Sequence, residues 1–279
     1  MLRIHLADSR NESSQLEDAV HLLNGVCFAE LWESEASVFV RPSDLSSAGQ
    51  RAAAGQHILV IDSAHCVAEI DRLAEACSNI NAKLMFARTA RHRAYPQAIA
   101  DSLQAGLLGE PGLVRIHHWQ PKDARITATE RLTDEIDIAC SLFGTAPEVI
   151  FGLRVGDGFQ AHLGFPSGGM ALIGCVNELP QDAEPYYTIT LIGSRGAAYA
   201  DDHHNSNLLI GKTTTGLTVR GAVNPYESIL RNFVDFVSDN TMNEQTIHAA
   251  KRAAAVAAAA IEASESGNTL KLVGERYEL

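Results

Sequence analysis

The sequence predicts an α/β part followed by an α+β part. The first is a truncated Rossmann-like parallel sheet, and the second is an open, mainly antiparallel sheet with helices on one face. Up to about residue 90, short apolar runs alternate with helical patterns, which indicates crossover connections between parallel strands. From residue 148 to about 218, strand-like runs follow one another with short turns, which indicates antiparallel pairing.

Five strands and three helices are predicted in the first part. The strands are Leu2–Ala7, Val26–Leu31, Ala36–Val40, His57–Ile61 and Lys83–Ala87. Residues 58–61 are all apolar, as expected for a parallel sheet that is buried on both faces. Apolar residues recur at helical spacing in the segments between the strands, and a glycine follows the first two of these helices. The helices are Ser14–Leu23, Leu45–Ala54 and Ala64–Ala76.

In the second part, a strand and two helices precede the run of strands. The helices are Tyr95–Ala105 and Thr129–Leu142, and the strand between them is Leu113–Trp119. The successive strands are Val149–Val155, Phe159–Phe165, Met170–Val176, Tyr187–Ile192, Ala197–Ala200, Asn207–Gly211 and Leu217–Val219. The chain closes with helices and a strand at Tyr226–Ser238, Glu244–Ser264 and Thr269–Val273. We therefore expect a shortened Rossmann-like domain at 1–90 and an α+β substrate and oligomerisation domain at 91–279.

The composition limits the classes of partner. A hydrophobic content of 46% and a charged content of 20% are those of a globular protein. The net charge of −12 disfavours nucleic acid and anionic membranes, because their phosphates are repelled. The five cysteines are far apart and form no CxxC pair, so we expect reduced cysteines and no zinc site. No signal-peptide pattern or membrane span is evident, which favours a cytoplasmic protein.

Four stretches, in the order and spacing of a known family, carry a resemblance. They are residues 53–60, 97–115, 134–144 and 260–272. These stretches resemble, in turn, a strand, the entry into the second domain, a substrate-site helix and the closing segment of the Gfo/Idh/MocA (glucose-fructose oxidoreductase / inositol dehydrogenase) family. The resemblance implies a Rossmann-like domain followed by an antiparallel sheet, and an oxidoreductase that uses NAD or NADP on a sugar or polyol.

The sequence departs from the family where the cofactor binds. The first strand of the family leads into GxGxxG, whose glycines let the backbone approach the pyrophosphate. Here residues 8–14 contain no glycine. Asp8 and Glu12 either lie where the pyrophosphate would bind or act as charges at the start of a helix, and in both roles they disfavour a dianion. Roughly thirty residues, one βα unit, are also missing after the second strand.

The hydride-transfer residues differ as well. Asp62 matches the family's lysine, Asp134 its catalytic histidine, and Glu130 the acidic residue one turn earlier. A carbinol substrate needs a group that moves its proton and a cation beside the developing alkoxide, and carboxylates supply neither unless their pKa values are strongly perturbed. We therefore expect no cofactor, with NAD or NADP as the alternative.

Residues Glu130, Asp134, Asp137 and Ser141 lie on one face of the predicted helix. This face is either a solvated acidic stripe, the polar floor of a ligand site, or a carboxylate pair for acid–base work or a hard cation.

Two further groups are candidates for ligand contacts. His117 and His118 lie next to each other on a strand, so only one can point towards a site, and each is otherwise an ordinary half-buried histidine. Arg91, which matches an arginine of the family, forms either a salt bridge at the domain junction or a contact with an anion or a sugar. A metal site at the turn of His203 and His204 is a weaker alternative, and we expect none.

These observations lead to one functional hypothesis and two alternatives. The candidate catalytic residues are Asp134, Glu130 and Asp62, and the candidate substrate-binding residues are Arg91, His117, His118 and Asp137. We expect a protein that keeps a polar, sugar-sized site, binds a sugar or sugar acid and has lost hydride transfer. We also expect it to form a homo-oligomer through the second sheet, or to partner a full-length relative. The alternatives are a divergent NAD(P)-dependent oxidoreductase and a lyase or epimerase that uses the carboxylates.

Overall fold

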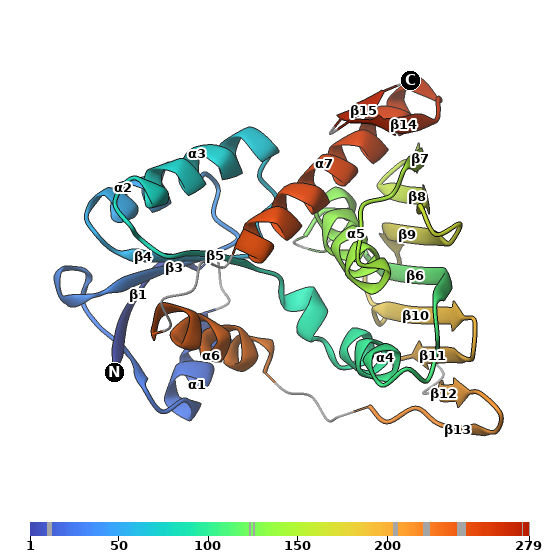
Figure 1. Cartoon of the computed structure of the whole chain (residues 1–279), viewed down its shortest axis with the longest axis horizontal. Coiled ribbons are helices and arrows are strands. Elements are labelled where there is room, and N and C mark those ends of the chain that lie inside the picture. Colours follow the sequence, from blue (N-terminus) through green and yellow to red (C-terminus); the bar gives the residue numbers. More distant parts are fainter. Residues whose placement is uncertain are drawn as a thin grey trace. The chain divides into compact units, whose positions relative to one another are not determined.

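The structure, a computed structural model, describes residues 1–9, 13–122, 124, 126–202, 206–219, 224–238, 244–274 and 276–278. The chain forms two compact units (Figure 1). The first contains Met1–His92 and Ala222–Ala254, and the second contains Arg93–Gly221 and Ala255–Leu279. The predicted fold class is confirmed, with a parallel sheet in the first unit and a mixed sheet with helices in the second.

The first unit is built on a five-stranded parallel sheet in the order β2-β1-β3-β4-β5. Its strands are β1 Leu2–Ser9, β2 Val26–Phe28, β3 Ala36–Val40, β4 His57–Ile61 and β5 Leu84–Ala87. A doubly wound sheet runs 3-2-1-4-5-6, and the observed order is this one with the third strand left out. Between β2 and β3 the chain forms only a short 3-10 turn, η1 Leu31–Glu33, so β2 is shorter than predicted.

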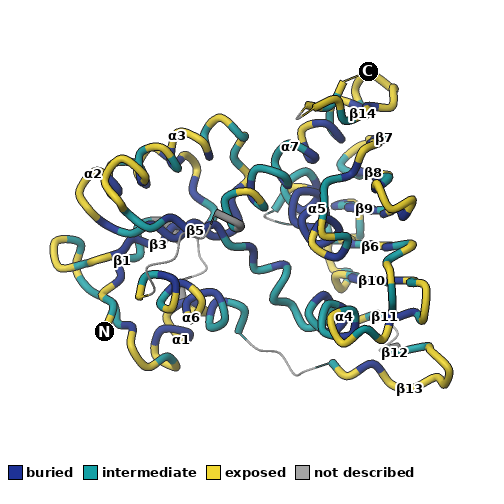
Figure 2. The backbone as a smooth tube through the Cα atoms, viewed as in Figure 1, coloured by how far each residue is buried: buried dark blue, intermediate teal, exposed yellow. Residues whose placement is uncertain are grey.

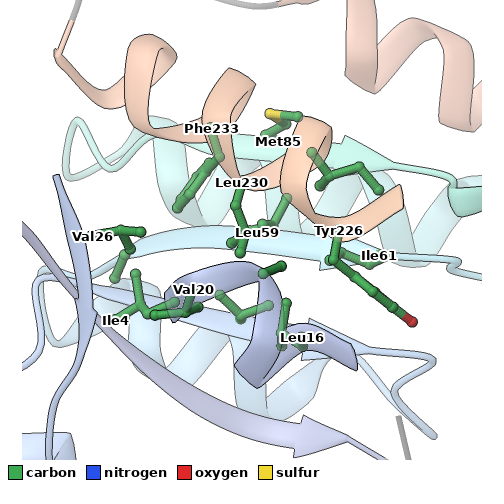
Figure 3. Packing of buried hydrophobic residues seen from close by; sticks show 14 of the residues in the cluster. Ile4, Leu16, Val20, Val26, Leu59, Ile61, Met85, Tyr226, Leu230 and Phe233 are labelled. Carbon is green, nitrogen blue, oxygen red and sulfur yellow. The ribbon is translucent and has the colours of Figure 1, made fainter. Parts of the chain in front are cut away.

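Helices cover both faces of this sheet. On one face lie α1 Ser13–Leu22 and α6 Pro225–Ser238, where Leu16, Leu230 and Phe233 pack on Ile4 and Leu59 (Figure 3). On the other face lie α2 Ser46–Ala53, α3 Val67–Ser78 and the first part of α7 Glu244–Ser266. The domain assignment from the sequence differs here. Residues 222–254 belong to the first unit, because the apolar faces of these helices complete its core.

The second unit is built on a ten-stranded mixed sheet in the order β13-β12-β11-β10-β6-β9-β8-β7-β14-β15. Its strands are β6 Pro111–Pro121, β7 Val149–Val155, β8 Gly158–Gly164, β9 Met170–Leu179, β10 Tyr186–Gly193, β11 Ala197–Asp201, β12 Ser206–Ile210, β13 Thr214–Gly216, β14 Leu270–Val273 and β15 Arg276–Glu278. Among the described strands of this sheet, β6 and β9 alone pair in parallel. The strand predicted at Leu217–Val219 is wrong, because the hairpin from β12 already closes at Thr214–Gly216, and β15 was not predicted.

Two helices, α4 Ala94–Gln104 and α5 Ala128–Phe143, pack on one face of this sheet. Residues of β9 alternate between buried and partly exposed, so this strand is buried on one face and leaves the other face partly open. In the part of the chain that the structure describes, no helix is long and apolar enough to cross a membrane.

Candidate functional site

Helix α5 is the element that carries most of the predicted site residues. Thr127 caps its first turn, and the side chain of Glu130 returns to the backbone nitrogen of Thr127 at 2.9 Å. Gly144, with a φ of 73°, ends the helix in the left-handed conformation that glycine adopts without strain. Between these ends the helix is buried nearly all round, at Ala128, Arg131–Cys140 and Leu142 (Figure 2).

This burial separates the four polar residues that the helical spacing had placed together. Glu130 is engaged in the capping box, which gives it a structural function at the helix start. Asp134 and Asp137 are buried, and Ser141 is exposed. The interpretation as a solvated acidic stripe is therefore wrong, because both aspartates are buried. Their roles as catalytic or substrate-binding residues stay predictions.

The centre of the helix carries a carboxylate that the sequence analysis had not selected. Glu135 is fully buried and receives three donors on its two oxygens. His118 Nδ1 lies 2.7 Å and an Arg93 nitrogen 3.2 Å from Oε1, and the Tyr187 hydroxyl donates to Oε2 at 3.3 Å. The Arg93 guanidinium also lies over the Tyr187 ring, 5.1 Å from its centre. Residues from α5, β6, β10 and the start of α4 thus meet at one buried charge.

The hydrogen bonds of His118 define its protonation. Nδ1 lies 2.7 Å from the Glu135 carboxylate, which only accepts, and 3.4 Å from a nitrogen of Arg93. The much shorter contact with the carboxylate indicates that Nδ1 carries the proton. Nε2 faces two donors, a guanidinium nitrogen of Arg131 at 3.0 Å and the Gln120 amide nitrogen at 3.2 Å, so it is an acceptor. Burial lowers the pKa of His118 more than the neighbouring Glu135 raises it. The imidazole is therefore neutral, in the tautomer that Glu135 selects.

The same charges set the ionisation of Glu135. Burial alone raises the pKa of this carboxyl, but Arg93 and the hydrogen bond from His118 outweigh it, and the pKa lies below the ordinary value. The opposite holds for Tyr187, whose pKa is raised well above the ordinary value by burial and by the Glu135 charge. The site thus holds an ionised carboxylate beside a neutral imidazole and a neutral phenol.

The two neighbouring histidines point to opposite faces of the sheet, as predicted. His118 faces α5. His117 lies on the opposite face of the sheet, which α4 and α5 leave open, and it stacks on Trp119 with ring centres 5.7 Å apart. Arg91 lies in the first unit, in the short turn η2 Thr89–His92. Its role as a substrate contact stays a prediction.

Asp62 lies at the carboxyl end of β4 in the first unit, in a network of its own. Its side chain is buried and accepts hydrogen bonds from the backbone nitrogen and the hydroxyl of Thr89, at 2.8 and 2.7 Å. It also pairs with Arg41, the residue that follows β3, at 2.9 Å. Asp62 and Arg41 both have a positive φ, 53° and 48°, which is uncommon for residues other than glycine. Three successive strands of the parallel sheet are thus joined at their carboxyl ends.

This network bears on the cofactor that the fold implies. Doubly wound sheets bind dinucleotides at the carboxyl ends of their strands, where glycines leave room for the pyrophosphate. Here charged side chains bonded to one another occupy the ends of β3 and β4, and the order of strands lacks the unit that borders the adenosine half. Glu12 and the side chain of Asp8 lie outside the described residues. At the described strand ends, charged side chains therefore lie where the fold would need open space, and the expectation that no dinucleotide binds stays a prediction.

A metal centre is not supported by the described residues. Within them, no group of three His, Cys, Asp or Glu side chains is arranged to hold a metal ion. The turn of His203 and His204 lies outside the described part of the chain. The five cysteines are free thiols, of which Cys77, Cys140 and Cys175 are buried.

Several solved structures have a fold similar to that of this chain. An oxidoreductase from Agrobacterium radiobacter in complex with NAD+, L-tartaric acid and magnesium is similar with a TM-score of 0.83 and 14% identity, over 97% of this chain and 98% of that one. The WlbA dehydrogenase from Bordetella pertussis, in complex with NADH and UDP-GlcNAcA, gives 0.75 and 15%, over 98% of each chain. UDP-N-acetylglucosamine 3-dehydrogenase from Acidithiobacillus ferrooxidans gives 0.78 and 17%, over 95% and 98%.

A parallel sheet followed by a mixed sheet with helices on one face is thus the fold of a two-domain oxidoreductase. More narrowly, the chain has the fold of the Gfo/Idh/MocA-type oxidoreductases, as the resemblance in the sequence predicted. At these identities the likeness is one of fold. No protein-family model matches the sequence, and no curated protein matches it.

Proposed function

We propose that this protein binds a polar small molecule, a sugar or sugar acid, and does not transfer hydride to or from NAD(P). One observation carries the proposal: Asp62, at the position of the family's lysine, is buried and bonded to Arg41 and Thr89 across the carboxyl ends of the parallel strands. A carboxylate held in this way is neither the cation that stabilises an alkoxide nor a free base. The hydrogen bonds and the ion pair of its side chain stabilise the first unit.

The second unit supports the binding half of the proposal. The buried network of Arg93, His118, Glu135 and Tyr187 brings hydrogen-bond donors and acceptors together, and groups of these kinds suit recognition of hydroxyl and carboxylate groups. Two of the similar structures were solved with acids, L-tartaric acid and UDP-GlcNAcA, and this agrees with a ligand of that class.

The alternative function is a divergent NAD(P)-dependent oxidoreductase, and the observation in its favour is the fold shared with structures that contain NAD+ and NADH. A turnover assay separates the two. The protein is incubated with NAD+ or NADP+ and a panel of polyols, sugars and sugar acids, and formation of reduced nicotinamide is followed by absorbance. We expect none with any pair. Turnover with any pair that is lost in Asp134→Ala would instead establish the oxidoreductase.

We also propose that two copies associate through the open face of the ten-stranded sheet. Large apolar side chains are exposed on strands of this sheet, including Trp119, Leu153, Met170, Ile192 and Leu208. Exposed apolar side chains gathered over several neighbouring strands are typical of an interface. A full-length relative that presents the same sheet is the other partner that this face would accept.

A further inference from the structure

Arg131 is a buried cation that forms no salt bridge with any residue that the structure describes. The residue is only 7% exposed, and its three hydrogen bonds go to neutral acceptors. These are His118 Nε2 at 3.0 Å, Asn177 Oδ1 at 3.4 Å and the Ile126 carbonyl oxygen at 3.5 Å. Among the described residues, no carboxylate forms a salt bridge with Arg131, and Glu135 and Asp134 attract it only from a longer distance.

This arrangement is costly for an isolated protein. A guanidinium that leaves water loses several kcal/mol of hydration, which a paired carboxylate normally offsets. Arg93, the other cation of the network, has such a partner in Glu135 and keeps 31% of its side chain exposed. Burial lowers the pKa of Arg131, the direction expected for a cation that has left water. The compensating charge is therefore expected from outside the chain.

The hydrogen-bond donors around His118 also indicate that an acceptor is missing. Both Arg131 and Gln120 direct an N–H at Nε2, at 3.0 and 3.2 Å. A neutral imidazole nitrogen has a single lone pair, so it satisfies only one of these donors fully. At least one N–H of Arg131 or Gln120 is thus left for a further acceptor next to the guanidinium. Two donors beside a buried positive charge form a site for an oxyanion.

We propose that Arg131 is the anchor of an anion site in the second unit, and that the ligand of this protein carries a carboxylate. This rests on the proposed function and assigns the ligand class. The planar guanidinium matches the fork of a carboxylate, with Gln120 as a second donor. His118 Nε2, which Glu135 keeps as an acceptor, then receives a neighbouring hydroxyl of the ligand. A hydroxy acid such as a sugar acid satisfies every one of these groups, whereas a neutral sugar leaves Arg131 uncompensated.

The test is a calorimetric titration of the full chain with D-gluconate, D-glucuronate and L-tartrate, beside D-glucose, glucose 6-phosphate and inorganic phosphate. We expect at least one hydroxy acid to bind and D-glucose to bind at least about tenfold more weakly, the loss typical of one charged hydrogen bond. Arg131→Gln should weaken binding by about tenfold to a hundredfold. The control is Arg115→Gln. Arg115 lies on the open face of β6, the strand that carries His118 and Gln120, and its replacement should leave the binding affinity unchanged.

A second variant keeps the test valid if Arg131→Gln fails to fold. Gln120→Glu introduces a carboxylate beside Arg131, so it should raise the melting temperature and abolish binding of the hydroxy acid. The proposal is overturned if no hydroxy acid binds, if glucose binds as tightly, or if Arg131→Gln binds normally. Binding of glucose 6-phosphate or inorganic phosphate, without binding of any hydroxy acid, would refute the proposal that the ligand carries a carboxylate. Turnover with NAD(P) overturns the proposed function instead, and it leaves the anion site to be judged by these titrations.

Discussion

Replacing Glu135 by glutamine tests whether the buried network holds the second unit together. Glutamine keeps the shape but removes the charge on which His118, Arg93 and Tyr187 converge. Breaking a buried ion pair costs about 3–5 kcal/mol, and the partial exposure of Arg93 reduces this to about 2–4 kcal/mol, since the freed guanidinium regains water. For a unit of this size, we expect the melting temperature to fall by about 2–4 °C for each kcal/mol.

Urea unfolding of the second unit measures this loss directly. The chain has two tryptophans, and Trp32, in the first unit, is 80% exposed. A Trp32→Phe background leaves Trp119 as the reporter of the second unit. The matched control is Glu178→Gln, which removes an exposed carboxylate from the same sheet and should leave the stability nearly unchanged, because water screens its ion pair with Lys122.

The pH dependence gives a second signature of the same residue. The pKa of Glu135 is below its ordinary value of 4.5 in the folded protein, so the unfolded state binds the proton first. The stabilisation is complete above that ordinary value and is lost as the pH falls through the folded pKa. The lowered pKa of His118 acts in the same direction below its ordinary value of 6.5. If Glu135→Gln is as stable as Glu178→Gln at neutral pH and loses no pH dependence, the network does not stabilise the unit.

Three other predictions follow from the contacts. Gly152→Ala would place a methyl group against the Ala260 carbonyl oxygen, so it should lower the free energy of unfolding in urea by more than about 3 kcal/mol. Gly49→Ala, the control in α2, has open space around the new methyl group and should raise the free energy of unfolding by up to about 1 kcal/mol. Thr127→Ala should cost about 1 kcal/mol by removing the cap of α5, and Glu130→Gln should leave hydroxy-acid binding intact; lost binding would return Glu130 to the site. Light scattering should show a homo-oligomer that Leu172→Lys on the open face dissociates, and a wild-type monomer at micromolar concentration would refute this interface.

Local patterns in the sequence were sufficient for most of the fold. The limits of β3, β4 and β7 agree residue for residue with those predicted, because each is a short run dominated by Val, Ile, Leu and Phe between turn signals. The pairing of β6 with β9 and of β10 with β6 depends on register between distant segments, which no local pattern encodes. The placement of residues 222–254 in the first unit is of the same kind.

The candidate site was harder to predict for a physical reason. Helical periodicity separates polar from apolar faces, but α5 is buried on almost every side, so its polar residues carry no such signal. Glu135 was missed because it lies beside Leu132 and Ile136 on a face that looked apolar. A glutamate at such a position, one turn after Arg131, was the available sign of a buried charge network.

The central claim, that the fold is kept without dinucleotide chemistry, is tested most directly by calorimetric titration of the wild-type chain with NADH and NADPH. The Arg41–Asp62–Thr89 network at the carboxyl ends of the parallel strands predicts no saturable heat up to millimolar cofactor. Saturable binding of either cofactor at micromolar concentration would contradict the account.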